Sequence, residues 1–147
     1  MNALVDTSVW SLALRRNSTD LTAAERLVVD ELAHLTREGR ARIISLIRQE
    51  LLSGIKRARQ YEKLRLALRA FPDEPVDTSD YEAAAKVSSD CRSRGIAPSV
   101  VDALICQIAL ARQWSIFTTD PDFKAYAKAL PIKLHAPRPA GRALVSG

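Results

Sequence analysis

Four acidic residues of this sequence, Asp6, Glu50, Asp102 and Asp120, each follow or open a predicted secondary-structure element. Two carboxylates about 4 Å apart repel each other by roughly 4 kcal/mol at an effective dielectric near 20. A pocket that gathers several acids therefore requires protonation or a bound cation. Because carboxylate and water oxygens are ligands for hard ions, the expected cofactor is Mg²⁺, with Mn²⁺ as a substitute, rather than zinc.

Histidine and cysteine offer no competing catalytic set. His34 and His135 are far apart and have no neighbouring ligand pattern, which argues against a zinc site and against a Ser/His/Asp triad. Cys91 and Cys106 lack CxxC spacing, so we expect reduced, structural thiols. Catalytic chemistry is therefore expected from carboxylates.

The excess positive charge is concentrated in one segment. The formal net charge is +5, and residues 56–69 hold six basic residues against one acid, Glu62. Acids, a hard cation and a basic surface together suit phosphodiester hydrolysis, because a bound metal lowers the pKa of an attacking water. The candidate nucleic-acid contacts are Lys56, Arg57, Arg59 and Lys63. A solvated helix face, or a surface for an acidic partner, is the open alternative.

Strand and helix patterns alternate along the chain. The apolar, partly β-branched runs at 3–5, 41–46, 115–118 and 132–134 predict strands, with a brief further strand at 76–77. Helical periodicity or capping signals predict helices over the segments 7–14, 22–39, 48–54, 55–71, 79–95, 99–111 and 122–129. Capping boxes are expected at Thr22 with Glu25 and at Ser79 with Glu82, and an acidic variant at Ser99 with Asp102.

This alternation predicts the α/β class, a three-layer α/β/α fold around a small parallel sheet of about four to five strands. In such a sheet, ligands bind at the carboxyl ends of the strands. Asp6 ends the first strand, Glu50 falls early in the helix after the second, Asp102 lies in the first turn of the most apolar helix, and Asp120 follows the strand 115–118. All four acids are therefore expected at one edge of the sheet.

The length of 147 residues fits one domain, expected over residues 1–136, with a flexible tail over 137–147. No apolar run approaches the ~18–20 residues that span a bilayer, and no signal-peptide pattern opens the chain. A cytoplasmic protein without membrane contact is expected.

At these acids the sequence resembles the PIN domain family, and more closely its VapC branch. The stretch Leu4-Val5-Asp6-Thr7-Ser8 is similar to the opening strand and acid of the family, and Glu50-Leu51-Leu52-Ser53-Gly54-Ile55 is similar to the second motif. The third and fourth motifs are matched by Asp102-Ala103-Leu104-Ile105 and Thr118-Thr119-Asp120-Pro121-Asp122-Phe123. The motifs are weak singly and specific together.

The resemblance implies a Mg²⁺-dependent endoribonuclease toxin, usually a homodimer, held inactive by a VapB-like antitoxin whose C-terminal segment occupies the acidic groove. It implies catalytic roles for Asp6, Glu50, Asp102 and Asp120. Asp6 and Asp102 are expected to bind metal with support from Glu50 and Asp120, and Asp122 is the alternative fourth acid. Thr7, Ser8 and Thr118 are expected to hydrogen-bond the acids or the waters of the metal.

Two other functions compete with this interpretation. An acid-pocket phosphatase would use Asp6 as a covalent nucleophile, but position 8 is Ser rather than the second Asp that such enzymes need. A catalytically inert PIN-like module would bind RNA or a partner protein only. The presence of all four acids argues against an inert pocket.

Overall fold

The computed structural model describes residues 1–14 and 18–140, and residues 141–147 of the expected tail lie outside this range. Its centre is a four-stranded sheet of the order β2-β1-β3-β4, in which every pair of neighbours is parallel. The strands are β1 (Ala3–Val5), β2 (Ala41–Arg42), β3 (Ser115–Phe117) and β4 (Lys133–Leu134). This confirms the predicted α/β class with a small parallel sheet, and β4 is the expected edge strand.

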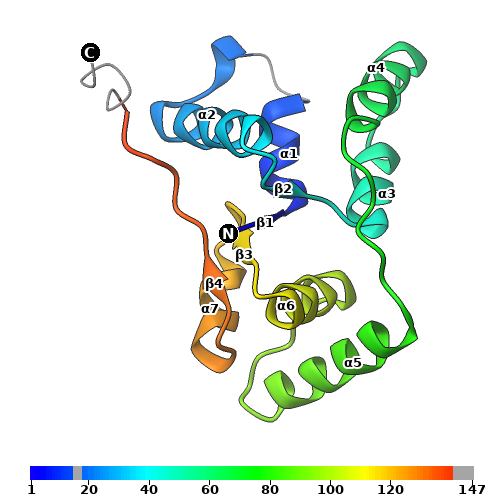
Figure 1. Cartoon of the computed structure of the whole chain (residues 1–147), viewed down its shortest axis with the longest axis vertical. Coiled ribbons are helices and arrows are strands. Elements are labelled where there is room, and N and C mark those ends of the chain that lie inside the picture. Colours follow the sequence, from blue (N-terminus) through cyan, green and yellow to red (C-terminus); the bar gives the residue numbers. More distant parts are fainter. Residues whose placement is uncertain (15–17, 141–147) are drawn as a thin grey trace.

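Within residues 1–14 and 18–140, seven helices surround the sheet, with α1 and α2 on one side and α5 and α6 on the other (Figure 1). Their bounds are α1 (Thr7–Leu14), α2 (Ala23–Arg37), α3 (Ser45–Ser53), α4 (Ala58–Leu68), α5 (Thr78–Arg92), α6 (Val100–Arg112) and α7 (Asp122–Ala129). A single 3₁₀ turn, η1 (Ser18–Asp20), precedes α2 in the part of the chain that is described.

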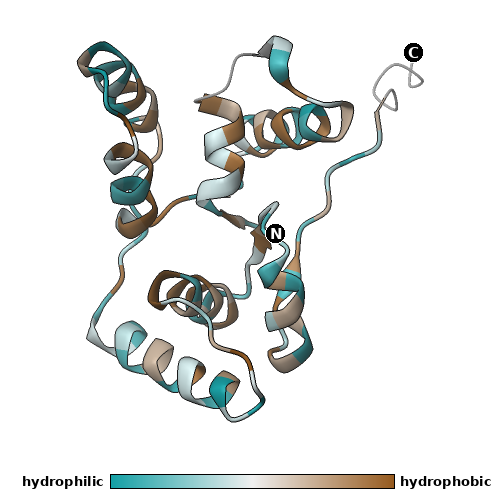
Figure 2. Ribbon diagram, turned by 180° about the vertical axis from the view of Figure 1, so that it is seen from behind, coloured by the Kyte–Doolittle hydropathy of each residue, from teal (hydrophilic) through white to brown (hydrophobic). Residues whose placement is uncertain are grey.

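The hydrophobic core is built around β1 and α6, which lie at the centre of the fold. All three residues of β1 are fully buried, and six residues of α6 are buried. Figure 2 shows these two elements as predominantly hydrophobic, whereas the outer helix α5 carries more polar residues. The helix after Ser99, which the sequence marks as the most apolar one and which we expect to be the most buried, is α6, and it has more buried residues than any other described helix. Cys91 and Cys106 are buried and free, and burial raises the pKa of the Cys106 thiol to about 12.

The second strand is shorter than the sequence predicted. The β-branched run 41–46 predicts one long strand, but β2 ends at Arg42 and α3 already begins at Ser45. Ile43 and Ile44 are fully buried where the chain turns, so they serve the core rather than an extended ladder. Glu50 consequently lies in the second half of α3, not early in it.

The entry into α5 also differs from the prediction. Residues 76–77 form no strand, and the capping box consists of Asp77 and Asp80 instead of Ser79 and Glu82. The carboxylate of Asp77 accepts from the backbone N–H of Asp80 at 3.1 Å, and an Asp fills this capping role as well as a Ser. The box at Thr22 and Glu25 is confirmed. At Ser99 the hydroxyl accepts from the N–H of Asp102 at 3.1 Å.

The chain after β4 is tied to α2. Glu31, which is 1 % exposed, accepts from His135 Nε2 at 2.7 Å and from the backbone N–H of Arg138 at 3.1 Å. The guanidinium of Arg138 also reaches Glu38 at 2.6 Å. These contacts hold the described start of the expected tail against the domain.

Candidate metal-dependent active site

Asp6 is held by two hydroxyl groups at the carboxyl end of β1. Its Oδ2 atom accepts from Ser8 Oγ and from Thr118 Oγ1, both at 2.8 Å. Each hydroxyl has one proton and uses it on Asp6, while Ser8 Oγ accepts from Thr119 N and Thr118 Oγ1 accepts from Asp120 N, both at 3.0 Å. Asp6 is only 6 % exposed, and the hydroxyls of Ser8 in α1 and of Thr118 after β3 fix the position of its carboxylate.

Thr7 connects a second acid to the same edge. Its hydroxyl donates to Glu50 Oε1, which joins the first residue of α1 to the second half of α3. Glu50 is exposed. The three hydroxyl residues named from the sequence, Thr7, Ser8 and Thr118, therefore each bond an acid.

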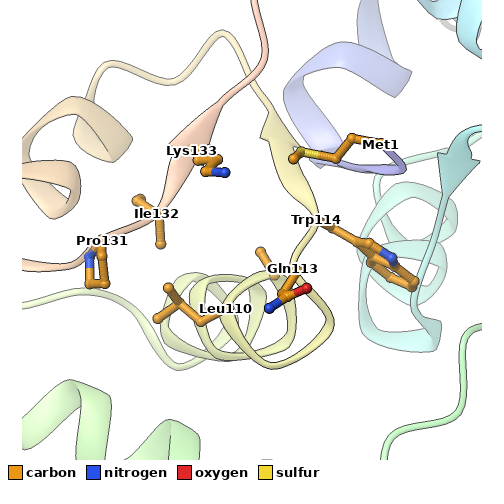
Figure 3. A pocket seen from close by; sticks show the side chains of 8 residues that line it. Met1, Leu110, Gln113, Trp114, Pro131, Ile132 and Lys133 are labelled. Atoms are coloured by element: carbon orange, nitrogen blue, oxygen red, sulfur yellow. The ribbon is translucent and has the colours of Figure 1, made fainter.

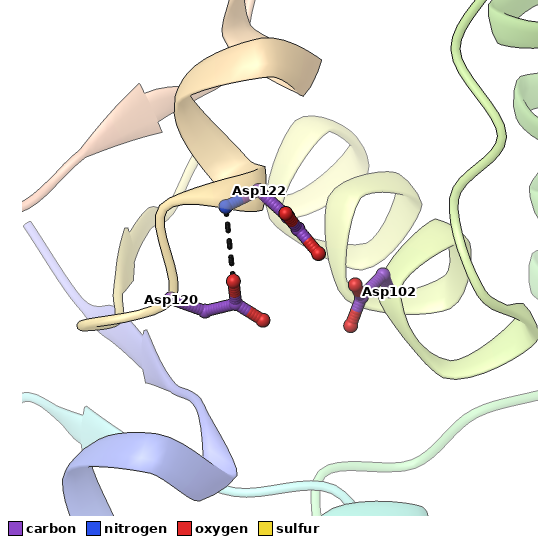
Figure 4. Close-up of side chains that lie close together, drawn as sticks. All are labelled: Asp102, Asp120 and Asp122. Carbon is purple, nitrogen blue, oxygen red and sulfur yellow. Dashed lines mark hydrogen bonds between the residues drawn. The ribbon is translucent and has the colours of Figure 1, made fainter.

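Three further acids lie together at the neighbouring strand end. Asp102, Asp120 and Asp122 each offer a carboxylate oxygen, and these oxygens lie within 4.8 Å of one another (Figure 4). Asp120 lies in the turn that leads from β3 into α7, and Asp122 is the first residue of α7, where its backbone N–H donates to Asp120 Oδ1 at 2.9 Å. Asp102 comes from the first turn of α6. We call Asp102, Asp120 and Asp122 the acidic cluster.

The electrostatic environment of Asp102 opposes its negative charge. Burial raises the pKa of Asp102, and the nearby charges of Asp6 and Asp120 raise it further. A hydrogen bond from the Tyr126 hydroxyl to Asp102 Oδ2, 2.7 Å long, acts in the opposite direction. Because the charge of Asp6 acts on Asp102, the hydroxyl-held acid and the acidic cluster form one electrostatic unit.

No basic side chain of the described residues forms an ion pair with this unit. None of the ion pairs that join described residues includes Asp6, Glu50 or a member of the acidic cluster. The cluster offers oxygen donors only and contains no Cys or His, and a donor set of this kind fits Mg²⁺ or Mn²⁺ better than zinc. The site thus combines uncompensated negative charge with ligands for a hard divalent ion.

The structure groups the predicted acids differently from the sequence analysis. Asp6 and Asp102 were expected as the metal pair, with Glu50 and Asp120 in support, but the three closest acids among the described residues are Asp102, Asp120 and Asp122. Asp120 and Asp122 are alternatives for the fourth acid from the sequence alone, whereas in the structure both contribute to the cluster. Tyr126 was not among the predicted site residues, although its spacing of four residues from Asp122 places both on one face of a helix.

The comparisons with known proteins identify the family to which this fold belongs. The family model described as "PIN domain" matches residues 3–129, from the first residue of β1 to the last of α7. This chain belongs to the PIN domain family. No curated protein matches it.

Three solved structures share the PIN fold at low sequence identity. FitAcB from Neisseria gonorrhoeae is 22% identical with a TM-score of 0.71, and the match covers 92% of this chain and 97% of that chain. VapBC2 from Rickettsia felis, bound to a DNA fragment from its promoter, is 17% identical with a TM-score of 0.67 and covers 92% and 98%. VapBC-5 from Mycobacterium tuberculosis, a toxin-antitoxin system, is 18% identical with a TM-score of 0.63 and covers 90% and 96%.

Three of the four candidate nucleic-acid contacts line a groove beside α1 and α4. Lys56, Arg57, Arg59 and Lys63 are all exposed. A hollow of about 740 Å³ is lined by Lys56, Arg57 and Lys63 and by apolar residues from the end of α1, the α3–α4 turn and α4. It begins close to the C-terminal end of α3, the helix that carries Glu50. We call this hollow the basic groove.

A second hollow lies at the opposite end of the sheet from the acids (Figure 3). It measures about 400 Å³ and is formed by Met1, the end of α6 with the turn that follows it, and residues 131–133. These residues lie before β1, before β3 and at the start of β4, and they include no acid. No helix among the described residues is long and apolar enough to cross a membrane.

Proposed function

We propose that this PIN domain is a Mg²⁺-dependent endoribonuclease of the VapC type, a toxin that a VapB-like antitoxin neutralises. The observation that carries the proposal is the acidic cluster: three carboxylate oxygens within 4.8 Å of one another, from side chains that form no ion pair with a described basic residue. Repulsion among such groups is relieved by a divalent ion, and Mg²⁺ accepts carboxylate ligands while it keeps several waters.

Asp102, Asp120 and Asp122 are the residues that would hold the ion. A bound Mg²⁺ would lower the pKa of a coordinated water and stabilise the charge that develops on the scissile phosphate. Ser8 and Thr118 donate to Asp6 and so fix the position of its carboxylate at the end of β1. Glu50, held by Thr7, is exposed and is available to accept a proton from a reacting water.

The basic residues at the start of α4 are proposed to contact the RNA backbone. Lys56, Arg57, Arg59 and Lys63 are exposed, and they follow Glu50 along the chain from the α3–α4 turn into α4. Their charges attract phosphates without regard to base sequence. Cleavage specificity would then depend on the shape of the RNA, and single-stranded loops offer shapes that a protein can distinguish.

An antitoxin partner and a homodimer belong to the same proposal. Two similar folds support it, since VapBC-5 is described as a member of a family of toxin-antitoxin systems and another as a toxin-antitoxin complex from Klebsiella pneumoniae. A basic side chain of the antitoxin would neutralise the acidic cluster as a metal ion does. A dimer is checked by light scattering at micromolar concentration, where a monomer would contradict that part. A cytoplasmic location follows from the proposed substrate.

The deciding experiment is cleavage of total cellular RNA by the purified chain without antitoxin. The assay contains Mg²⁺, Mn²⁺ or EDTA and is repeated with Asp102→Asn. Discrete fragments that require both the metal and Asp102 would support the nuclease. If no RNA is cut and no metal binds, the chain is a binding module with an inert pocket.

A further inference from the structure

Tyr126 brings a buried hydroxyl group to the acidic cluster. The residue lies in α7 and is 5 % exposed, and its ring packs edge-on against Phe123 with centroids 5.0 Å apart. The hydroxyl donates to Asp102 Oδ2 at 2.7 Å. A phenol hydroxyl carries one proton, and the geometry shows that Tyr126 uses it on the Asp102 carboxylate.

The position of Tyr126 follows from the sequence of α7. Asp122 opens the helix and Tyr126 comes four residues later, so the two side chains share one helix face. One helix therefore supplies both a carboxylate of the cluster and the donor that contacts the carboxylate from α6. A tyrosine suits this place because its ring fills the core while its hydroxyl reaches a polar group at the end.

We infer that Tyr126 is a positioning residue of this site: its hydroxyl fixes the orientation of the Asp102 carboxylate toward Asp120 and Asp122. The inference rests on the proposed function, because it assigns the orientation to the binding of a divalent cation. A carboxylate that is free to rotate must lose that freedom when a cation binds. A carboxylate already held by a hydrogen bond loses less, so the site binds more tightly.

Asp6 is oriented by similar means within the same site. Two hydroxyls donate to Asp6, whereas the phenol of Tyr126 donates to Asp102. Loss of a group that orients a metal ligand typically costs about 10- to 100-fold in metal affinity or activity. Since Tyr126→Phe removes a single hydroxyl and keeps the ring, a loss near the lower end of this range is expected.

The test is calorimetric titration of the full chain with Mn²⁺, without RNA. The wild type is compared with Tyr126→Phe, with Asp102→Asn as the variant that removes a ligand, and with Tyr81→Phe as the matched control. Tyr81 is 47 % exposed on α5, so its variant removes a phenol hydroxyl from the surface. Circular dichroism confirms that each variant is folded. Tyr126→Phe should bind Mn²⁺ about tenfold more weakly, and Tyr81→Phe should match the wild type.

The outcomes separate the inference from the proposed function. If Tyr126→Phe binds as tightly as the wild type while Asp102→Asn does not bind, the role of Tyr126 is wrong and the metal site stands. If the wild type itself does not bind Mn²⁺, the metal site is wrong, and the role of Tyr126 is wrong with it. If Tyr126→Phe binds Mn²⁺ about tenfold more weakly while Tyr81→Phe binds it as tightly as the wild type, the inference is supported.

A measurement on the unaltered chain provides a second test, which is needed if Tyr126→Phe does not fold. A cation that draws charge from Asp102 weakens the hydrogen bond that this carboxylate accepts from Tyr126. Addition of Mn²⁺ should therefore change the ultraviolet difference spectrum of tyrosine in the wild type and in Tyr81→Phe, but not in Asp102→Asn. Mn²⁺ binding without any tyrosine signal in the wild type would overturn the inference.

Discussion

Two groups of acidic side chains in the described structure differ in their partners. Asp80 and Glu31 pair with basic side chains: Arg112 lies 3.0 Å from Asp80, and His135 and Arg138 contact Glu31 at 2.7 and 3.3 Å. Asp6 and the acidic cluster contact hydroxyl groups and backbone N–H groups, and no ion pair described in the structure includes them.

The surroundings of Asp80 and of Asp102 shift the pKa of these two carboxyls in opposite directions. The guanidinium of Arg112 lowers the pKa of Asp80, while burial and neighbouring acids raise the pKa of Asp102. The first arrangement stabilises the folded chain, because the charged form is favoured in the native state. The second destabilises it and leaves negative charge for a ligand to neutralise. Substitutions that remove charge should therefore have opposite effects at Asp80 and at Asp102.

The largest effect is expected from Asp102→Asn in the RNA cleavage assay. The substitution keeps the size of the side chain and removes one charge of the acidic cluster, so cleavage should fall by about a thousandfold or more. Rates are measured on a mapped fragment of the target RNA at saturating Mg²⁺. Wild-type rates in this variant would contradict the assignment of the site.

The same variant should be at least as stable as the wild type without metal. Because the pKa of Asp102 is raised, its ionised form opposes folding above the folded-state pKa, and this penalty vanishes below the unfolded-state value of about 3.9. The stability gained in Asp102→Asn is thus largest near pH 7 and disappears toward pH 4. Urea unfolding at both pH values measures it, and a clear loss of stability at pH 7 would contradict the comparison.

Removal of the cation from the other group should destabilise the fold. Arg112→Met keeps an apolar stem but leaves Asp80, which is 8 % exposed, without the guanidinium, and it also removes the bond from Arg112 to the carbonyl of Pro75. A loss of about 1–3 kcal/mol in the free energy of unfolding is expected for a largely buried pair. Cleavage by the folded fraction should stay unchanged, because Arg112 lies at the far end of α6 from Asp102.

The pH dependence of Arg112→Met provides its control. A lowered folded-state pKa contributes stability that is present above the unfolded-state value of about 3.9 and is lost as the pH falls through the folded-state value. The difference between the wild type and Arg112→Met should therefore shrink below about pH 4. A difference that is independent of pH would show that packing, rather than the ion pair, is lost.

The comparison also shows what the sequence could predict. The boundaries of β1 and α6 followed from continuous apolar runs, and the placement of Asp6 and Asp102 followed from them. The pairing of Asp80 with Arg112 was not predicted, because 32 residues separate them and only the packing of α5 on α6 brings them together. The same limit applies to Tyr126 and Asp102, which are 24 residues apart. Ile43 and Ile44 were assigned to a strand because β-branched residues suit both a strand and a buried turn.

Ser8→Ala should have a smaller effect than the loss of an acid. The variant removes one of the two hydroxyls that donate to Asp6 and leaves Thr118 as the other. Loss of one orienting partner should lower cleavage about tenfold. Ser79→Ala is a matched control, since the Ser79 hydroxyl donates at 2.7 Å to Asp77, an acid outside the site. Equal activity in Ser8→Ala and the wild type would show that Thr118 alone orients Asp6.

The smallest effect concerns the basic residues, which can be divided in the same way as the acids. Arg65 forms an ion pair with Glu62 at 2.7 Å, whereas Lys63 belongs to no described ion pair and lines the basic groove. Lys63→Gln should therefore weaken RNA binding about two- to fourfold at physiological salt and lower the salt slope by about 0.7–0.9, the amount expected for one phosphate contact. Arg65→Gln should change both values less, because its charge is already compensated. Binding is measured by fluorescence anisotropy with Asp102→Asn as the background, so that the RNA stays intact. If Arg65→Gln weakens binding as much as Lys63→Gln, the RNA responds to the total charge of α4, and the distinction between paired and unpaired groups applies to the acids alone.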